Sequence, residues 1–277
     1  MQGEGARTMG YMLRVDVWHG EIPLYTRVEG NGDPIFYFHP AGGPLWNPFL
    51  DWLAQRYTVY MPYHPGIHPE APQAIHKVKS IEHLVLLYEE LIERLRVRPV
   101  AMFGQSFGGM VACEMAAWRP DVTPKLVVFD PVGLWREDAP VLPQWMIRPP
   151  HELPELLFAN PSSPAAQQFL AVPDDPEAAV KAQVALGWAI ACTGKFVWPL
   201  PDKGLADRLP RIQAETLIVW GREDKLIPAI YAEEFGRLIP RSRIVIIENC
   251  GHIPEVEATS EVIRAVSMFL GVSADVT

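Results

Sequence analysis

The sequence predicts an α/β protein in which a mainly parallel sheet is covered by helices on both faces. Two observations carry this prediction. Short, continuous apolar runs alternate with segments of helical period, as expected for strands that are buried on both faces. The polar residues that could take part in catalysis or binding lie just after such runs, at His39, Ser106, Asp224 and His252. We therefore expect them to gather at the carboxyl edge of the sheet, where proteins of this class bind ligands.

The elements predicted from these patterns run in order along the chain. Apolar runs at 11–18 and 22–28 flank a short turn and predict a hairpin. Strands at 35–38 and 57–61 enclose a helix at 46–55, and a second helix covers 80–95. After these come a strand at 100–103 with its helix up to 118, strands at 125–130 and 216–220, a helix at 227–238, a strand at 244–247 and a closing helix at 260–270.

The segment 131–210 interrupts this alternation. Seven prolines between positions 140 and 164 leave room for short helices only, with one longer candidate at 176–192. An insertion of this length is too long for a loop and should form a subdomain. We therefore predict a discontinuous core from 9–130 and 211–272, with a helical cap at 131–210 inserted after the sixth strand.

Composition limits the classes of function. A hydrophobic content of 49% with 21% charged residues is typical of a globular protein with a substantial core. The net charge of −9 argues against nucleic acid or an anionic membrane as a partner. Neither a signal peptide nor a membrane-spanning run is recognisable, and we exclude residues 1–8 from the fold argument as a tail. The three cysteines show no pairing or metal-ligand spacing, so we expect reduced thiols, no metal and a cytoplasmic location.

The segment Gly104-Gln105-Ser106-Phe107-Gly108 matches G-x-S-x-G, with an apolar run before it and a helical run after it. A Cβ two residues before or after the serine would collide with a neighbouring strand or helix, so both positions require glycine. The helix that follows directs free N–H groups at the serine, which favours developing negative charge there. By itself the motif does not exclude an ordinary Gly-Ser turn without chemistry.

The rest of the chain supplies partners for this serine. A serine hydroxyl is a poor nucleophile and needs an adjacent base, which in turn needs an orienting carboxylate. The order serine, acid, histidine that accompanies such a turn is present as Ser106, Asp224 and His252. Asp130, which follows the preceding strand, is the rival to Asp224 as the acid.

Four motifs in order carry a resemblance to a known family. They are Phe38-His39, the segment 104–109, Trp220-Gly221-Arg222-Glu223-Asp224, and Cys250-Gly251-His252-Ile253-Pro254. On these motifs the chain resembles α/β-hydrolases with a cap, in layout close to bacterial carboxylesterases and meta-cleavage-product C–C hydrolases, from about Tyr11 to Leu270. The resemblance implies an eight-stranded sheet with an antiparallel second strand. It also implies Ser106 as nucleophile, His252 as the base that later acts as acid, and Asp224 as the orienting acid.

The resemblance also implies an oxyanion hole built from backbone N–H groups. One donor is Phe107, and the second is Ala41, with Gly42 next in line. Pro40 stands where the family has glycine, and proline has no N–H to donate. We expect His39 to hold this loop by hydrogen bonds.

A second departure from the family follows the fourth strand. Members often show an aspartate shortly before a Pro-Gly turn there, whereas this chain has Tyr63-His64-Pro65-Gly66. We expect His64 and His68 to lie on a surface loop, with contact to the substrate as the alternative.

Six residues are candidates to contact the substrate. An aromatic side chain in a small subdomain is usually part of its core, so most aromatic residues of the insertion should pack within it. The candidates are His39, Trp135, Trp145, Met146, Trp188 and Ile253.

These features predict a serine hydrolase without a cofactor that cleaves carboxylic esters of small to medium apolar substrates through an acyl-enzyme on Ser106. Its partner is a small molecule, and a homodimer is left open. Lactone hydrolysis and C–C cleavage of a vinylogous diketone are the alternatives, although C–C hydrolases usually carry an arginine near the serine. The first arginine after Ser106 is Arg119, and Arg136 and Arg148 lie in the insertion. A non-enzymatic alternative is a receptor that has the same fold and binds a ligand without catalysis.

Overall fold

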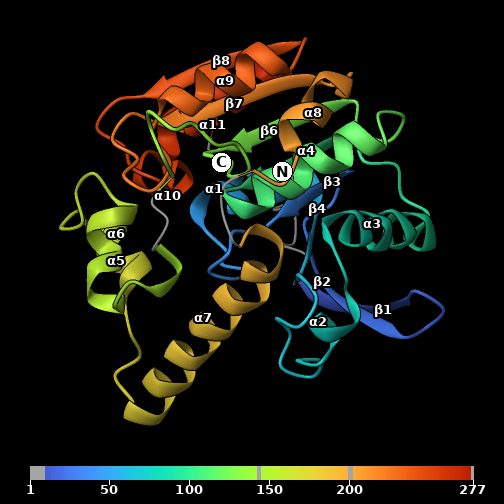
Figure 1. Cartoon of the computed structure of the whole chain (residues 1–277), viewed down its shortest axis with the longest axis horizontal. Helices are drawn as coiled ribbons and strands as arrows, with labels where there is room; N and C mark the ends of the chain where they lie inside the picture. The colour runs from blue at the N-terminus through green and yellow to red at the C-terminus, as the bar shows by residue number, and fades with distance from the viewer. Residues whose placement is uncertain (1–9, 142–144, 199–201, 276–277) are drawn as a thin grey trace, which may run out of the picture.

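The strands form one twisted sheet, and the described residues of this computed structural model are 10–141, 145–198 and 202–275. Within these ranges eight strands pair in the order β1-β2-β4-β3-β5-β6-β7-β8 (Figure 1). Their bounds are β1 (Tyr11–Val17), β2 (Ile22–Glu29), β3 (Asp33–Phe38), β4 (Tyr57–Pro62), β5 (Ala101–Gln105), β6 (Lys125–Phe129), β7 (Glu215–Gly221) and β8 (Ser242–Ile247).

The sheet is mostly parallel. Strand β2 runs antiparallel to both of its neighbours, β1 and β4, and the pairs from β4–β3 onward to β7–β8 are parallel. The predicted eight-stranded sheet with an antiparallel second strand is therefore confirmed. All the parallel strands end at one edge, and the residues that follow them are placed side by side there.

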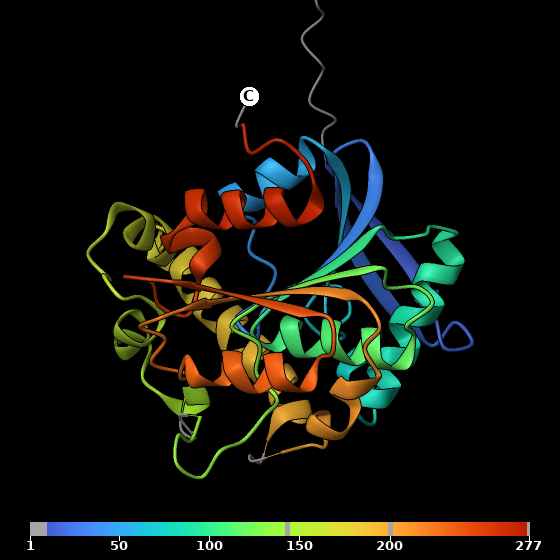
Figure 2. The same cartoon turned by 90° about the horizontal axis from the view of Figure 1, so that it is seen from above.

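Helices cover both faces because successive strand residues point to opposite sides. Phe36 and Phe38 pack into the cluster beneath α3 (Ile81–Leu95), α4 (Phe107–Trp118) and α9 (Ile230–Leu238). Ile35 and Tyr37 pack into the cluster beneath α1 (Pro48–Ala54) and α11 (Thr259–Leu270). Figure 2 shows the sheet nearly edge-on between these two layers.

Capping side chains explain where several helices begin. Asn47 accepts a hydrogen bond from the Leu50 N–H and Pro48 opens α1, so this helix begins two residues later than predicted. Ser80 caps α3 in the same way, by accepting from the His83 N–H. Two further short helices are α2 (Ala74–Lys77) and α10 (Pro254–Glu257).

The described parts of the segment between β6 and β7 contain several helices from Trp145 onward. They are η1 (Trp145–Ile147), η2 (Pro150–Glu152), α5 (Leu153–Leu157), α6 (Pro164–Leu170), α7 (Pro176–Val197), α8 (Leu205–Arg208) and η3 (Leu209–Arg211). In Figure 1 helices α5 to α7 lie to one side of the sheet, and the N-terminal half of α7 points away from it. Although α7 has 22 residues, no helix in the described ranges combines the length and apolar content needed to cross a bilayer.

The end of this segment belongs with the main core. Leu205 and Leu209 are fully buried in the cluster that contains α4. Arg208 donates two hydrogen bonds to the buried Glu114 of α4, at 2.7 and 2.6 Å. The last residues of the predicted cap therefore pack with the main core, and the boundary at 210 stays a prediction.

Candidate active site

The serine turn joins β5 directly to α4. Ser106 has φ 51° and ψ −116°, a conformation that is strained for a residue with a side chain. A Cβ on Gly104 would lie 2.1 Å from the Gly108 carbonyl oxygen, and one on Gly108 would lie 1.9 Å from the Phe38 oxygen. These distances are far below van der Waals contact, so the turn can form only with glycine at both positions, as the sequence suggested.

Three of the predicted site residues meet at this turn. His252 Nε2 lies 2.9 Å from Ser106 Oγ, and His252 Nδ1 lies 2.7 Å from Asp224 Oδ2. All three side chains are buried. Because a carboxylate only accepts, the His252 proton sits on Nδ1, which leaves the Nε2 lone pair facing the serine hydroxyl. This arrangement allows His252 to take the serine proton.

Asp224 is held by the turn that follows β7. Its Oδ1 accepts hydrogen bonds from the N–H groups of Leu226 and Ile227, at 2.8 and 2.9 Å. Oδ2 is thereby left for His252. The turn therefore orients the carboxylate and, through it, the imidazole ring.

The backbone of His252 is fixed from two directions. The side-chain amide of Gln105 donates to the His252 carbonyl oxygen at 2.7 Å, and the His252 N–H donates to the Leu157 carbonyl oxygen at 2.8 Å. Gln105 was not among the predicted site residues, because it occupies a variable position of the G-x-S-x-G motif. Its place beside the serine is the signal that could have found it.

A carboxylate also joins the histidine loop to the insertion. Glu257 Oε2 accepts from the Gly251 N–H at 2.7 Å and from the Ala159 N–H at 3.1 Å, and Oε1 accepts from the Asn160 N–H at 2.8 Å. A Cβ on Gly251 would lie 2.6 Å from the Leu157 carbonyl oxygen, so the two segments approach closely. The insertion is therefore bonded directly to the loop that carries His252.

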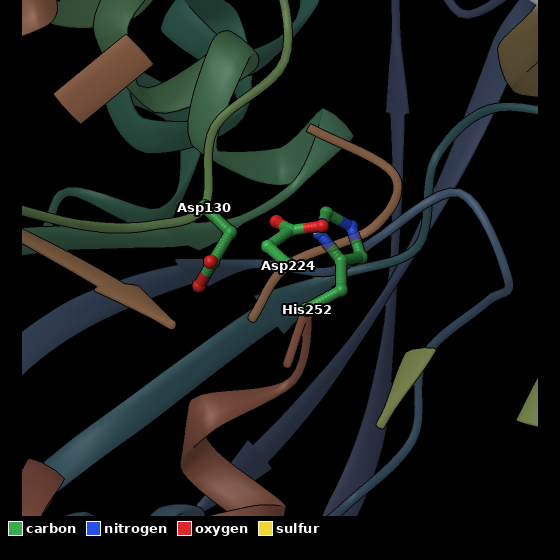
Figure 3. Close-up of side chains that lie close together, drawn as sticks. All are labelled: Asp130, Asp224 and His252. Carbon is green, nitrogen blue, oxygen red and sulfur yellow. The ribbon is translucent and has the colours of Figure 1, made fainter. Parts of the chain in front are cut away.

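Asp130, the rival acid, lies next to this group. Figure 3 shows its carboxyl beside Asp224 and His252, and one donor atom from each of the three lies within 4.8 Å of the others. Asp130 Oδ1 accepts from the Gly221 N–H at 3.0 Å, while Oδ2 has no partner among the described residues. Burial, followed by the charge of Asp224, raises the pKa of Asp130 well above its usual range. Burial thus disfavours the charged form of Asp130, and an uncharged carboxyl orients an imidazole poorly.

This group is also the set among the described residues whose spacing could suit a metal ion. Its atoms already bond to one another or to the backbone: His252 pairs with Asp224 and Ser106, and Gly221 donates to Asp130. Asp130 Oδ2 alone of these side-chain donor atoms has no partner among the described residues, and the expectation of a site without metal or cofactor stays a prediction.

A second buried carboxyl lies three residues beyond the histidine. Tyr37 donates to Glu255 Oε1 at 2.7 Å, and Glu255 Oε2 has no partner among the described residues. Burial raises the pKa of Glu255 to about 7, although the Tyr37 hydrogen bond and nearby His252 oppose the rise. Glu255 can therefore change charge near neutral pH. Glu255 was not among the predicted site residues. Its place between Pro254 and Val256, close to His252, was the feature of the sequence that could have indicated it.

The predicted oxyanion donors surround the turn. Phe38 pairs with Gly104 in the sheet, so the loop after β3 leaves the sheet alongside the serine turn. The N–H groups of Ala41 and Gly42 have no hydrogen-bond partner within the part of the chain that the structure describes. Phe107 is the first residue of α4, and the first N–H groups of a helix have no acceptor inside it. Three backbone donors are thus free in this region.

Of the two histidines near this loop, only His64 departs from the expectation. His64 is almost fully buried, so the prediction that it lies on a surface loop is wrong. His39 Nδ1 bonds to the Pro40 carbonyl oxygen at 2.7 Å, and its Nε2 accepts from the His64 N–H at 3.1 Å. Both ring nitrogens of His39 are therefore occupied, which supports its expected role in holding the loop and leaves none free for a substrate.

The other substrate candidates are dispersed. Ile253 packs into a small cluster with Phe158 of the insertion, and Met146 lies against Gly194 of α7. Trp135 is half-buried against the core, and Trp188 is partly exposed and donates to the Gly66 carbonyl oxygen at 2.7 Å. The side chain of Trp145 lies outside the described residues. Trp188 and Ile253 thus connect the insertion to loops at the carboxyl edge of the sheet.

A buried Ser-His-Asp group at the carboxyl edge of a parallel sheet defines the class of the protein as a hydrolase. The profile of the Alpha/beta hydrolase family matches residues 31–265, and the chain belongs to this family.

Curated relatives of similar length include two hydrolases of oxodienoates. The chain is 24% identical to a 2-hydroxy-6-oxo-6-phenylhexa-2,4-dienoate hydrolase of Burkholderia cepacia over 249 residues, covering 83% of this chain and 84% of the relative. It is 26% identical to a 2-hydroxy-6-oxo-2,4-heptadienoate hydrolase of Pseudomonas putida over 284 residues, covering 94% and 99%.

Solved structures support the fold. A bacterial membrane phospholipase A has a TM-score of 0.75 at 22% identity, with 95% of this chain and 86% of that chain covered. The 2-hydroxy-6-oxo-6-phenylhexa-2,4-dienoate hydrolase of Rhodococcus has a TM-score of 0.70 at 18% identity, with 95% and 100% covered.

Proposed function

We propose that this hydrolase cleaves a C–C bond next to a ketone in a vinylogous diketone, through a covalent acyl-enzyme on Ser106. The observation that carries the catalytic part is the pair of distances that link Ser106 to His252 and His252 to Asp224, 2.9 and 2.7 Å. The bond type rests on the two oxodienoate hydrolases that are similar over most of the chain. The sequence alone had favoured esters, and the relatives favour the alternative.

In the proposed reaction His252 Nε2 takes the proton of Ser106 Oγ, and Oγ bonds to the ketone carbon. The N–H groups of Phe107 and of Ala41 or Gly42 donate to the resulting oxyanion. Its collapse breaks the C–C bond, and the leaving carbon takes a proton that His252 supplies. Water, deprotonated by His252, then releases the acid product and restores Ser106.

A substrate of this class carries a carboxylate and needs a cation. Arg119 and Arg136 are both occupied by acidic partners, Asp121 and Asp138 among them. Arg148 donates through Nη1 to Glu152 at 2.9 Å, but its buried Nε has no partner in the described part of the chain. We therefore propose Arg148 as the residue that receives the substrate carboxylate.

Ester hydrolysis is the second candidate, because the same serine, histidine and oxyanion donors act on any carbonyl with a suitable leaving group. It requires no cation for the substrate. Arg148 therefore distinguishes the two candidates.

The test compares 2-hydroxy-6-oxo-6-phenylhexa-2,4-dienoate with a panel of neutral p-nitrophenyl esters. We expect turnover of the dienoate that is lost in Ser106→Ala and lowered in Arg148→Gln, mainly through KM, while Arg136→Gln stays near the wild type. Ester turnover without dienoate turnover would replace the first candidate by the second. Turnover that persists in Ser106→Ala would remove Ser106 from the mechanism.

A further inference from the structure

His64 connects the loop after β3 to the elements around it. Its imidazole is buried two residues beyond β4, and its Nε2 lies 2.8 Å from the His39 carbonyl oxygen. Its own backbone N–H donates to His39 Nε2 at 3.1 Å. Its Nδ1 bonds to the hydroxyl of Tyr88, which α3 carries.

These contacts assign a proton to each ring. His39 Nε2 accepts from a backbone N–H, so the His39 proton is on Nδ1, where it is donated to Pro40. His64 Nε2 faces a carbonyl oxygen and must donate, which leaves Nδ1 to accept from Tyr88. Burial lowers the pKa of both histidines, that of His64 to about 4, which agrees with two neutral rings. All four ring nitrogens are thus used.

The same imidazole also touches the other side of the predicted oxyanion hole. The rings of His64 and Phe107 meet edge to face, with centroids 4.9 Å apart and an interplanar angle of 76°. The Phe107 ring in turn stacks on Phe196 of α7. His64 therefore contacts the loop that carries Ala41 and also the residue that carries the other donor.

The loop has little else to hold its shape. Pro40 cannot donate, and its carbonyl oxygen accepts from both His39 Nδ1 and the Gly43 N–H, the latter at 3.2 Å. Ala41 and Gly42 make no backbone hydrogen bonds in the described part of the chain. The position of their N–H groups thus depends on the anchor at His39, which His64 fixes from outside the loop.

We propose that His64 is a positioning residue for the oxyanion hole: by donating from Nε2 to the His39 carbonyl oxygen while packing on Phe107, it sets the distance between the two donor segments. The inference rests on the proposed function, since it presupposes an oxyanion on Ser106. It concerns the geometry of the hole and is independent of which bond is cleaved.

Two amide substitutions separate the His39 contact from the Tyr88 contact. The side-chain amide of glutamine reaches about as far as Nε2, so His64→Gln can still donate to the His39 carbonyl oxygen. That of asparagine reaches only as far as Nδ1, so His64→Asn keeps a partner for Tyr88 and loses the anchor. Both variants bury one neutral amide, which makes them a matched pair for stability.

The readout is the second-order rate of labelling by a fluorophosphonate, which bonds to a nucleophilic serine and places an oxygen in the oxyanion hole whatever the natural substrate. Rates are normalised to the folded fraction, measured by circular dichroism. We expect His64→Asn to slow labelling by about 10- to 100-fold, somewhat less than the loss of one whole donor, and His64→Gln by less than about fivefold. With a substrate that the wild type turns over, the kcat of each variant should fall by the same factor as its labelling rate, while KM stays within about threefold.

Two further variants complete the test. His83→Asn, a substitution of another buried histidine whose Nδ1 accepts from Lys79, should label like the wild type. Tyr88→Phe removes only the donor to Nδ1 and should slow labelling about three- to fivefold, within the limit expected for His64→Gln; it serves if the amide variants do not fold. Equal labelling of the wild type and the His64 and Tyr88 variants would overturn the inference while leaving the proposed function intact. A wild type that is not labelled at Ser106 would overturn both.

Discussion

Replacing Asp224 by asparagine should lower kcat by orders of magnitude, because it reverses the polarity of one hydrogen bond. The N–H groups of Leu226 and Ile227 hold Oδ1, so in Asp224→Asn the amide oxygen keeps this place and the NH₂ group faces His252 Nδ1. Two donors repel, so His252 moves its proton to Nε2. That nitrogen can then no longer accept the proton of Ser106.

The size of the effect follows from this change of tautomer. An orienting aspartate replaced by asparagine in a Ser-His-Asp triad lowers kcat by about 10⁴-fold, equivalent to about 5.5 kcal/mol. The matched substitution Asp130→Asn should lower kcat by less than about tenfold, because burial already disfavours the charged form of Asp130 and asparagine can still accept from Gly221. The two variants should therefore differ by about three orders of magnitude.

The assay measures kcat and kcat/KM of both variants beside the wild type, with the substrate that the wild type turns over. Circular dichroism and thermal unfolding confirm that both variants are folded. A larger loss in Asp130→Asn than in Asp224→Asn, with both folded, would show that the acid follows β6 and that the assignment to Asp224 is wrong.

Three further outcomes are expected. Gly108→Ala should give little soluble protein and no labelling of Ser106 by a fluorophosphonate, because the added Cβ would lie 1.9 Å from the Phe38 oxygen. Soluble protein that is labelled at Ser106 would contradict this expectation. Arg208→Met should lower the free energy of unfolding in urea by about 3–5 kcal/mol, because it leaves buried Glu114 without its partner, whereas a loss below about 1 kcal/mol would show that the pair matters little. Acid should destabilise the protein through His64. The pKa of His64 is about 4 in the folded state and 6.5 in the unfolded state, so the unfolded state binds more protons between these values. The free energy of unfolding should therefore fall by about 3 kcal/mol as the pH drops from 6.5 to about 4. Urea unfolding at pH 7.5, 5.5 and 4.5 checks this, and His64→Gln should lose this share of the pH dependence.

The order and type of the elements could be predicted from the sequence because both signals are local. Strands buried on two faces read as short apolar runs, and the helices have their own period and capping residues, as at Asn47 and Ser80. The serine turn is local as well. Its sharp geometry demands glycine at 104 and 108, so the motif, its strand and its helix could be recognised together.

The carboxyl edge of the sheet explains why Asp224 and His252 could be chosen with Ser106. Parallel strands end at one edge, so residues that follow different strands are brought together whatever their distance in sequence. How the last residues of the insertion pack could not be predicted from the sequence. Leu205 and Arg208 follow a proline-rich segment, and only the contacts with α4 show that they belong to the core.

The roles of two acids and the burial of one loop could be established only from the tertiary structure. Asp130 and Asp224 both follow strands, and only the space around them shows that Asp130 is buried against a like charge while Asp224 receives two backbone N–H groups. The loop that holds His64 reads as surface because it is rich in proline and histidine, yet Tyr88 and Phe107 bury it.

The sequence by itself determined the class of chemistry, since the turn around Ser106 depends on backbone sterics that a few residues specify. Which carboxyl carries the charge, and what holds the donors beside the serine, depends on burial and on partners far along the chain. Those properties arise only when the segments pack, and at this site packing raised the pKa of Asp130 and placed His64 between His39 and Phe107.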